Sequence, residues 1–455
     1  MLAFSDGRLS NRFWSHTVSI SEPIDTHQKA LSINLDPQIF GSFAEIGAGQ
    51  EVARWFLRVG AASGTVAKTI SAYDKDVSDD LYGAGTRYVS QARVQSMLEH
   101  EWAHLLSQLN ANRGATTRFF CFVDTISARN FTGDNECHGW IGLRFQTQPL
   151  GPPNDVILHV NLRDRSNLAQ QAAVGILGVN LIHAAFHCIF SADEFLGQLA
   201  AALSPQRIEF DFIEWKGAAL EQWSPHVIHA TLIAKRLAEA VVFPADGKLI
   251  PPTELLYKKA IVLAPVTFDV AKPAHGQMIK TALASLPKQE LEQSKASIGL
   301  LCLSCAAGVS GQLALTAAQI LEHIDAAQRL GVGVLVFHDR ELYRMGAFVN
   351  RFTKAPVHFA VELSTLVRAL QDNYKDLDGT LLEGLGRLFH ENVRLSVFPT
   401  PAAAMKDRLT ASDWKWTEAN GVIGARDIEP AEPLNHLYRY LVGSGFILPT
   451  EIADT

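Results

Sequence analysis

The chain has 455 residues, of which 47% are hydrophobic and 19% charged, which is a globular composition long enough for two or three domains. Its formal net charge is -7 with Lys and Arg scattered along the chain, which argues against a nucleic-acid-binding protein. Five Cys do not make a disulfide framework, and the first residues show no apolar run behind a basic segment. We therefore expect a cytoplasmic protein with reduced thiols.

Residues 1–38 are polar and interrupted by prolines, and we predict an N-terminal arm there, in which residues 15–22 could form an edge strand. Residues 40–74 then predict a strand, a glycine turn, a helix and a second strand. A helix is predicted over residues 89–109 from its apolar spacing. Residues 117–124 are a short apolar run that ends in an acid, as a buried strand would.

Residues 141–147 and 155–164 predict an antiparallel hairpin with a long turn. The segment at 169–190 is long and apolar enough to suggest a membrane span, but it carries Gln, Asn and His side chains and lacks basic flanks. A helix buried in a soluble α/β domain satisfies the same pattern, so we predict no membrane contact. Residues 208–215 alternate apolar and acidic side chains, which predicts an edge or one-sided strand.

Residues 226–242 predict a helix, and the Pro- and Gly-rich connection at 244–259 suggests a domain boundary. The second half alternates short apolar strands with amphipathic helices, which is typical of a parallel sheet covered on both faces. The strands are predicted at 260–268, 298–306, 331–339, 355–362 and 394–399. The predicted fold class is α/β with two Rossmann-like domains of mostly parallel sheets, at 39–245 and 246–455, the first with an added antiparallel hairpin.

The glycine turn is the sharpest local motif. Gly47 and Gly49 follow a predicted strand, and Gln50 leads into a helix whose N-terminal amides could face an anion. The sequence EIGAG, which starts at Glu45, is similar to the first motif of S-adenosylmethionine-dependent methyltransferases, with Glu51 where a third glycine would stand. A carboxylate there would repel a phosphate. The alternative is a strand-to-helix turn without a ligand.

Further polar residues follow predicted strands, where ligands of α/β folds gather. Asp74 ends the second predicted strand, at the position of a ribose-binding acid. Two clusters could form pocket walls, or simply solvated loops, and a third follows a strand of the second half. The first contains Arg129, Asn130, Asp134, Glu136 and His138, the second Arg163, Asp164, Arg165 and Asn167, and the third His338, Asp339, Arg340 and Arg344.

Three motifs are compatible with a metal or redox site, but a chance match or core packing explains each of them better. His100 and His104 complete an HExxH motif on a predicted helix, the pattern of zinc metalloproteases, but no third ligand follows in sequence. His183 and His187 share a helix face, which more often carries a satisfied buried His. Cys302 and Cys305 form a CxxC inside an apolar run rather than at a helix start. No metal site is therefore predicted.

From about residue 38 to the C-terminus the chain resembles a widespread family of soluble bacterial proteins. The stretches that carry the resemblance include FGSFAEIGAGQEVARWFLRVG, GTVAKTISAYDKDVSD, NLAQQAAVGILGVNLIHAAF, ELLYKKAIVL, LYRMGAFVNRFTK and LEGLGRLF. Members are often named nicotinamide-nucleotide adenylyltransferase or TonB-dependent receptor. The turn IGAGQ differs from the HxGH-like turn of the former, and the barrel strands of the latter are missing, so the resemblance implies fold and compartment rather than a reaction.

The leading hypothesis is a cytoplasmic protein that binds a nucleotide-like small molecule at residues 45–51, with nucleotidyl or group transfer as the activity class. No cofactor and no catalytic residue is identified from the sequence. The second hypothesis is a non-catalytic structural or regulatory protein that forms homo-oligomers. A zinc metalloprotease is the third.

Overall fold

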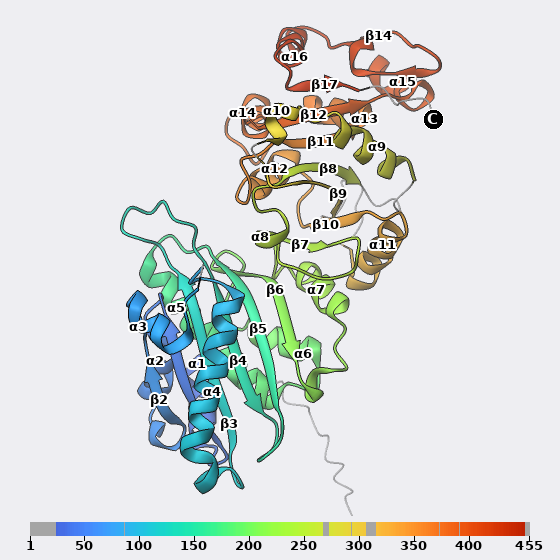
Figure 1. The fold of residues 1–455 in the computed structure, drawn as a ribbon. Coiled ribbons are helices and arrows are strands. Elements are labelled where there is room, and N and C mark those ends of the chain that lie inside the picture. The colour runs from blue at the N-terminus through green and yellow to red at the C-terminus, as the bar shows by residue number, and fades with distance from the viewer. Residues whose placement is uncertain are drawn as a thin grey trace, which may run out of the picture.

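The computed structural model describes residues 24–85, 87–266, 273–292, 294–305, 315–372, 374–390 and 392–450. The edge strand predicted at 15–22 lies outside these residues. The described chain is a mixed α/β protein with two main sheets, one in each half (Figure 1).

The first sheet is mixed rather than mostly parallel. Its strands, in spatial order, are β2 (Val66–Ile70), β1 (Ile39–Ile46), β3 (Arg118–Ser127), β4 (His138–Gln146), β5 (Pro153–Leu162) and β6 (Ile208–Lys216). The first three are parallel and the last three continue antiparallel. The predicted hairpin is confirmed as β4 and β5, and β6 is the edge strand.

Helices cover both faces of this sheet (Figure 1). One face carries α1 (Thr26–Leu35), α2 (Glu51–Arg58), α5 (Asn167–His187) and α6 (Ala192–Leu199), and the other carries α3 (Lys75–Tyr82) and α4 (Gln91–Arg113). Helix α1 begins at Asp25, whose side chain accepts from the amide of Gln28 in a capping box. Part of the segment predicted as an arm is therefore a helix that packs against α2 and α5.

Helix α5 is the apolar segment considered as a membrane span. In the described chain it is the one helix long and apolar enough to cross a membrane, and 72% of its most apolar window is buried inside the protein. Its Asn180 accepts from the buried Lys29 ammonium at 2.8 Å and donates to two backbone carbonyls. Burial lowers the pKa of Lys29 to about 8. Asn180 and Lys29 thus satisfy each other inside the protein, as polar groups of a core helix do, whereas Nδ1 of His183 in the same helix is buried without a partner among the described residues.

Strand order in the second sheet is β17, β12, β11, β8, β9, β10, β7, and all neighbours are parallel except β10 and β7. The strands are β7 (Ala240–Phe243), β8 (Ala260–Val266), β9 (Ser297–Ser304), β10 (Gly333–Phe337), β11 (Val357–Glu362), β12 (Val393–Phe398) and β17 (Ile447–Pro449). The strands predicted for the second half are therefore confirmed. The six parallel strands start at the centre with β8, run outward through β9 and β10, and return through β11 to the other side. This is the order 3-2-1-4-5-6 of doubly wound sheets.

Side chains of β8 alternate between two cores, as expected for a strand covered on both faces. Val262 and Ala264 face the core that contains α9 (Pro273–Ala284) and α11 (Ala317–Arg329). Ile261 and Leu263 face the core of α12 (Leu342–Val349), α13 (Leu363–Gln371) and α14 (Thr380–Leu388).

The remaining elements connect or close these layers. They are α7 (Pro225–Ala234), α8 (Pro252–Leu255), α10 (Lys288–Leu291), α15 (Ala402–Ala411), α16 (Leu434–Gly443), and two short strand pairs, β13 (Thr400–Pro401) with β15 (Val422–Ile423) and β14 (Lys415–Trp416) with β16 (Ile428–Glu429).

The helix predicted at 226–242 is wrong in its second part. Helix α7 ends at Ala234, and residues 240–243 form β7, which pairs with β10 in the second sheet. The sequence AVVF is rich in β-branched and aromatic side chains, which favours a strand. The second sheet thus begins before the domain boundary expected at 244–259.

The close contact between α2 and α5 generates a stability prediction. A Cβ on Gly178 of α5 would lie 2.3 Å from the Val52 side chain of α2. Gly178→Ala is expected to lower the free energy of unfolding by about 1–3 kcal/mol through overpacking. The matched control is Gly197→Ala in α6, where no atom lies within 4 Å of an added Cβ. It should raise stability by up to about 1 kcal/mol through helix propensity. Equal effects in chemical denaturation would contradict the tight contact.

Candidate functional site

The glycine turn joins β1 to α2 and has structural reasons for both glycines. Gly47 has a φ of +100°, and a Cβ there would lie 1.9 Å from the carbonyl oxygen of Ile126 on β3. Gly49 has a φ of +74°, which disfavours a side chain although space is open. The turn therefore requires glycine for its backbone and for close packing, with or without a ligand.

The amides at the start of α2 are already occupied. The carboxylate of Glu45, which is 1% exposed, accepts from the amide nitrogens of Val52 and Ala53 at 2.9 and 2.8 Å. Gln50 stands at the N-cap position without a capping hydrogen bond from its side chain. The position that a ligand anion would take at this helix end is thus filled by the protein's own carboxylate.

A second buried carboxyl group lies beside Glu45. Asp124 pairs in register with it on β3, and its Oδ1 accepts from the amide of Ile46 at 3.0 Å. Its Oδ2 is buried without a hydrogen-bond partner in the described chain. Burial, then the charge of Glu45, raises the pKa of Asp124 well above its usual value, and burial raises the pKa of Glu45 to about 7. The two carboxyl groups therefore keep their protons to a higher pH than free carboxyl groups do.

The other predicted ligand-binding residues are spread over several places. Asn167 lies near the glycine turn, because its side-chain oxygen accepts from the Gln171 side-chain amide at 2.6 Å, and the Gln171 side chain would lie 3.8 Å from a Cβ on Gly49. Asp164 accepts from Arg207 at 3.0 Å. Arg163 reaches a different cavity, between the two sheets.

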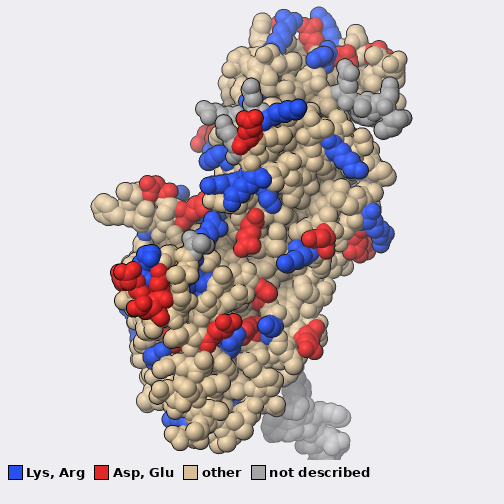
Figure 2. Space-filling view, in the orientation of Figure 1, with Lys and Arg blue, Asp and Glu red and all other residues tan. Residues whose placement is uncertain are grey.

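Asp74 caps α3, where its side chain accepts from the amides of Asp76 and Val77. Acidic side chains gather over this helix on the face shown in Figure 2. The structure thus gives Asp74 a role in starting α3.

The residues of the HExxH motif make structural contacts. Glu101 is buried, 2.5 Å from the Lys68 ammonium, and accepts from the Tyr82 hydroxyl at 2.9 Å. His100 and His104 stack with ring centroids 6.5 Å apart. Among the described residues, no group of three His, Cys, Asp or Glu side chains is placed to hold a metal ion.

The CxxC pair is buried in the second sheet. Cys302 Sγ lies 3.5 Å from Met345 Sδ, and burial raises the pKa of both thiols, that of Cys305 to about 12. Such thiols are not nucleophilic at neutral pH.

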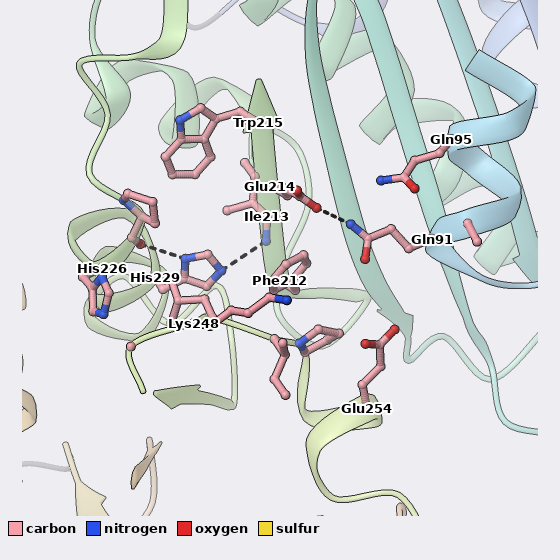
Figure 3. Close-up of a pocket in the computed structure, with 16 residues that line it drawn as sticks. Gln91, Gln95, Phe212, Ile213, Glu214, Trp215, His226, His229, Lys248 and Glu254 are labelled. Carbon is pink, nitrogen blue, oxygen red and sulfur yellow. Dashed lines mark hydrogen bonds between the residues drawn. The ribbon is translucent and has the colours of Figure 1, made fainter. Parts of the chain in front are cut away.

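The largest cavity among those described, about 600 Å³, lies between β6, α4, α7 and residues 247–251 (Figure 3). Its buried His229 accepts from the amide of Ile213 at 3.3 Å, and its Nδ1 donates to the carbonyl of Pro225 at 2.8 Å. Glu214 bonds Gln91 across the cavity wall. These hydrogen bonds hold α7 and α4 against the edge strand β6, so the polar groups that make them stabilise the fold.

A smaller cavity, about 200 Å³, lies at the switch point of the second sheet, where the order of the strands reverses between β8 and β11. It is bounded by the carboxyl ends of β8 and β11, which are neighbours in the sheet, and by the first turns of α9 and α13. Ligands of doubly wound sheets bind in the crevice at this switch point. The cavity is lined by Ala264, Pro265, Val266, Ala274, His275, Met278, Ser304, Arg340, Met345, Glu362, Ser364, Thr365 and Arg368.

The electrostatics of this switch-point cavity favour an anion. Arg368 is half-buried and makes no hydrogen bond through its side chain to any described residue. Arg340 binds Glu341 through Nε at 3.1 Å and keeps its other nitrogens available. Helix α13 starts directly after Glu362 without a side-chain cap, so its first amides, at Leu363 onward, are open to a ligand.

The third polar cluster predicted from the sequence contains Arg340, whereas Arg368, Ser364 and Thr365 were not predicted. The missed residues open a helix immediately after the predicted strand at 355–362. The rule that ligands gather beyond strand carboxyl ends could have found them, but the strand order that brings β8 and β11 together is not visible in the sequence.

No protein-family model and no curated protein matches this chain. Solved structures with a partial likeness include the competence/damage inducible protein CihA from Agrobacterium tumefaciens, with 20% identity, 36% of this chain and 96% of that chain covered, and a TM-score of 0.27. A CinA superfamily protein from Enterobacter cloacae has 12% identity, coverage of 39% and 99%, and a TM-score of 0.28. The competence damage-inducible protein A from Klebsiella pneumoniae has 11% identity, coverage of 35% and 95%, and a TM-score of 0.27. TM-scores this low do not assign a function.

The buried carboxyl pair predicts a pH dependence of stability. The pKa of Glu45 is raised from 4.5 to about 7, so the folded state binds more protons than the unfolded state between these values. The free energy of unfolding should therefore fall as pH rises through this window. Asp124→Asn keeps an acceptor for the Ile46 amide and removes one charge. It should make the slope shallower and the protein more stable above pH 7, as measured by denaturation at several pH values.

The exposed Asp378 provides the control, since Asp378→Asn should leave the slope unchanged. A wild-type slope in the Asp124 variant would show that the two carboxyl groups do not oppose each other.

Proposed function

We propose that the protein binds an anionic, nucleotide-like small molecule in the switch-point cavity of the second sheet. The observation that carries this proposal is the convergence of α9 and α13, through their N-terminal turns, on one crevice between β8 and β11. The proposal includes a Rossmann-like domain in the second half, for which the strand order is the support.

Each part of such a ligand has a matching group. Arg340 and Arg368 supply planar guanidinium donors for a phosphate, and the open amides of α13 add to them. Glu362, at the end of β11, is the acceptor available for a ribose hydroxyl. Met278 and Met345 provide adaptable apolar surface for a base.

The first half offers a weaker alternative at its glycine turn. There the Glu45 carboxylate already accepts from two α2 amides, so a phosphate would have to displace it and meet Glu51 as well. In the switch-point cavity no described carboxylate caps α13, although Ser364 Oγ lies 3.4 Å from Glu362. We therefore move the proposed ligand from residues 45–51 to the switch-point cavity.

Nucleotidyl or group transfer is the activity class that this site fits, because two cations beside a phosphate stabilise the charge that develops during transfer. A cytoplasmic location belongs to the same proposal, since nucleotides are available there.

A thermal-shift screen with nucleotides, dinucleotides and S-adenosylmethionine tests the proposal. A ligand at about 100 times its Kd stabilises the folded state by about 2.7 kcal/mol and raises the melting temperature. Arg368→Gln is expected to lower the affinity for the bound ligand by about tenfold or more, because a charged hydrogen bond contributes roughly 1.5–3 kcal/mol. The shift at a fixed ligand concentration should therefore shrink.

Arg439→Gln is the matched control, since the side chain of Arg439 is 66% exposed on α16. An undiminished shift in the Arg368 variant would place the ligand elsewhere. A complete absence of shifts, together with a multi-subunit mass by light scattering, would favour the alternative of a homo-oligomeric structural protein.

A further inference from the structure

A third cavity, of about 480 Å³, lies between the two halves and is separate from the switch-point cavity. From the first sheet it is lined by the start of β4 and the end of β5. From the second half it is lined by the start of β7 and by the C-terminal end of α12 and the residues after it. We refer to it as the inter-sheet cavity. Its His138, Asn161, Arg163, Glu239 and Arg351 side chains belong to one connected network that runs through both halves.

The network contains an Asp–His–His chain. The Asp211 carboxylate on β6 lies 2.6 Å from Nδ1 of His159 on β5, and Nε2 of His159 lies 3.1 Å from Nδ1 of His138 on β4. Asp211 and His159 are fully buried, whereas His138 is half-buried and lines the cavity. The chain therefore leads from a buried carboxylate to a solvent-accessible imidazole.

This chain dictates the tautomers of both rings. Asp211 also accepts from Asn161 at 3.0 Å, and burial, which would raise its pKa, is outweighed by His159, so the pKa of Asp211 is lowered and it stays ionised. An ionised Asp211 accepts from Nδ1 of His159, and in the neutral form of His159 its Nε2 then accepts from Nδ1 of His138. The Nε2 of His138 is left with an unshared electron pair, and it has no hydrogen-bond partner in the described chain.

Burial and the charges around His138 lower its pKa. Burial, followed by His159, lowers the pKa of His138 to about 4. Arg87 and Arg351 act in the same direction, and Asp211 acts against them. At neutral pH the unshared pair on Nε2 is therefore available to accept a proton.

Two arginines in the same cavity offer donors for an anion. Arg163 donates to Glu209 at 2.6 Å and also to Glu239, both through the same terminal nitrogen, while Arg351 donates to Glu239 at 3.2 Å through one terminal nitrogen. The remaining guanidinium nitrogens make no hydrogen bond in the described chain, and both arginines are exposed. Phe348 and Phe352 lie beside Arg351, each 5.4 Å from its guanidinium carbon, and form an apolar wall.

We propose that the inter-sheet cavity is a hydrolytic site in which His138 acts as general base in the hydrolysis of a small ester that also carries an anionic group. Arg163 and Arg351 bind the anionic group, and the apolar wall contacts the rest of the substrate. Nε2 of His138 takes a proton from water as the water oxygen bonds to the ester carbonyl carbon. The carbon–oxygen bond to the alcohol then breaks, and the alcohol oxygen takes the proton back from His138, which yields an acid and an alcohol.

A purely structural role for the network is the competing explanation, because it also ties β6 to β7 and α12. The two explanations differ in what happens at Nε2 of His138. A structural network needs only the Nδ1 contact with His159, whereas a general base needs the unshared pair on Nε2. Catalysis and its pH profile therefore separate them.

The test is hydrolysis of para-nitrophenyl hydrogen succinate by the full chain, with para-nitrophenyl acetate as the neutral comparison. The wild-type protein should hydrolyse the anionic ester preferentially, and kcat/KM should fall only below about pH 4, where His138 is protonated. His138→Gln should lower kcat by about 100-fold or more. Arg351→Gln should raise KM by about tenfold and change kcat little.

His436→Gln is the matched control, since the side chain of His436 is 75% exposed on α16. It should retain wild-type rates. Asp211→Asn, which disturbs the tautomers, should also lower kcat. If circular dichroism shows that this variant does not fold, the His138→Gln variant, at a half-exposed position, provides the test. No hydrolysis by the wild-type protein, equal rates for both esters, or wild-type kcat in the His138 variant would each overturn the proposal.

The switch-point proposal is tested independently. Arg368→Gln should reduce ligand-induced thermal shifts and leave ester hydrolysis unchanged, so failure of one proposal does not decide the other.

Discussion

Helix α7 packs against β6 of the first sheet and against α11 of the second half, and the arrangement of the whole molecule depends on this contact. Its apolar side chains make one continuous core from α5 and the first sheet through to β8 and α11. After α7 the chain forms β7, which pairs antiparallel with β10. The start of β7 therefore lies near the end of β5 and the start of β6, where the polar side chains are. The Arg163, Glu209 and Glu239 contacts follow from this placement.

The burial of acids on β6 shows where sequence reasoning stops. The alternation of β6 correctly predicted an edge strand, but Glu209 and Asp211, which suggested a solvated face, are each 1% exposed. They are covered by elements far away in sequence, and their side-chain hydrogen-bond partners are His159 and Asn161 on the neighbouring strand and Arg163 directly after it. Local periodicity contains no information about such cover.

The glycine turn illustrates a different limit. Its strand, turn and helix were all predictable, because glycine spacing and apolar periodicity are local properties. That the helix end is capped by the strand's own Glu45 depends on one side-chain orientation, which no spacing rule predicts. Likewise the parallel strands of the second half were predictable one by one, whereas the adjacency of β8 and β11 is a property of the assembled sheet. The fold class and the strands were therefore largely accessible from sequence, and the sites were not.

Helix α12 contributes side chains to two different cavities. Met345 lines the switch-point cavity, and Phe348, in the next turn, lines the inter-sheet cavity with Arg351 just beyond it. A helix of this length moves as a rigid rod, so a ligand that displaces α12 at one cavity changes the shape of the other. Thermodynamic linkage then requires the effect to be reciprocal: whatever one ligand does to the affinity for the second, the second does to the first by the same factor.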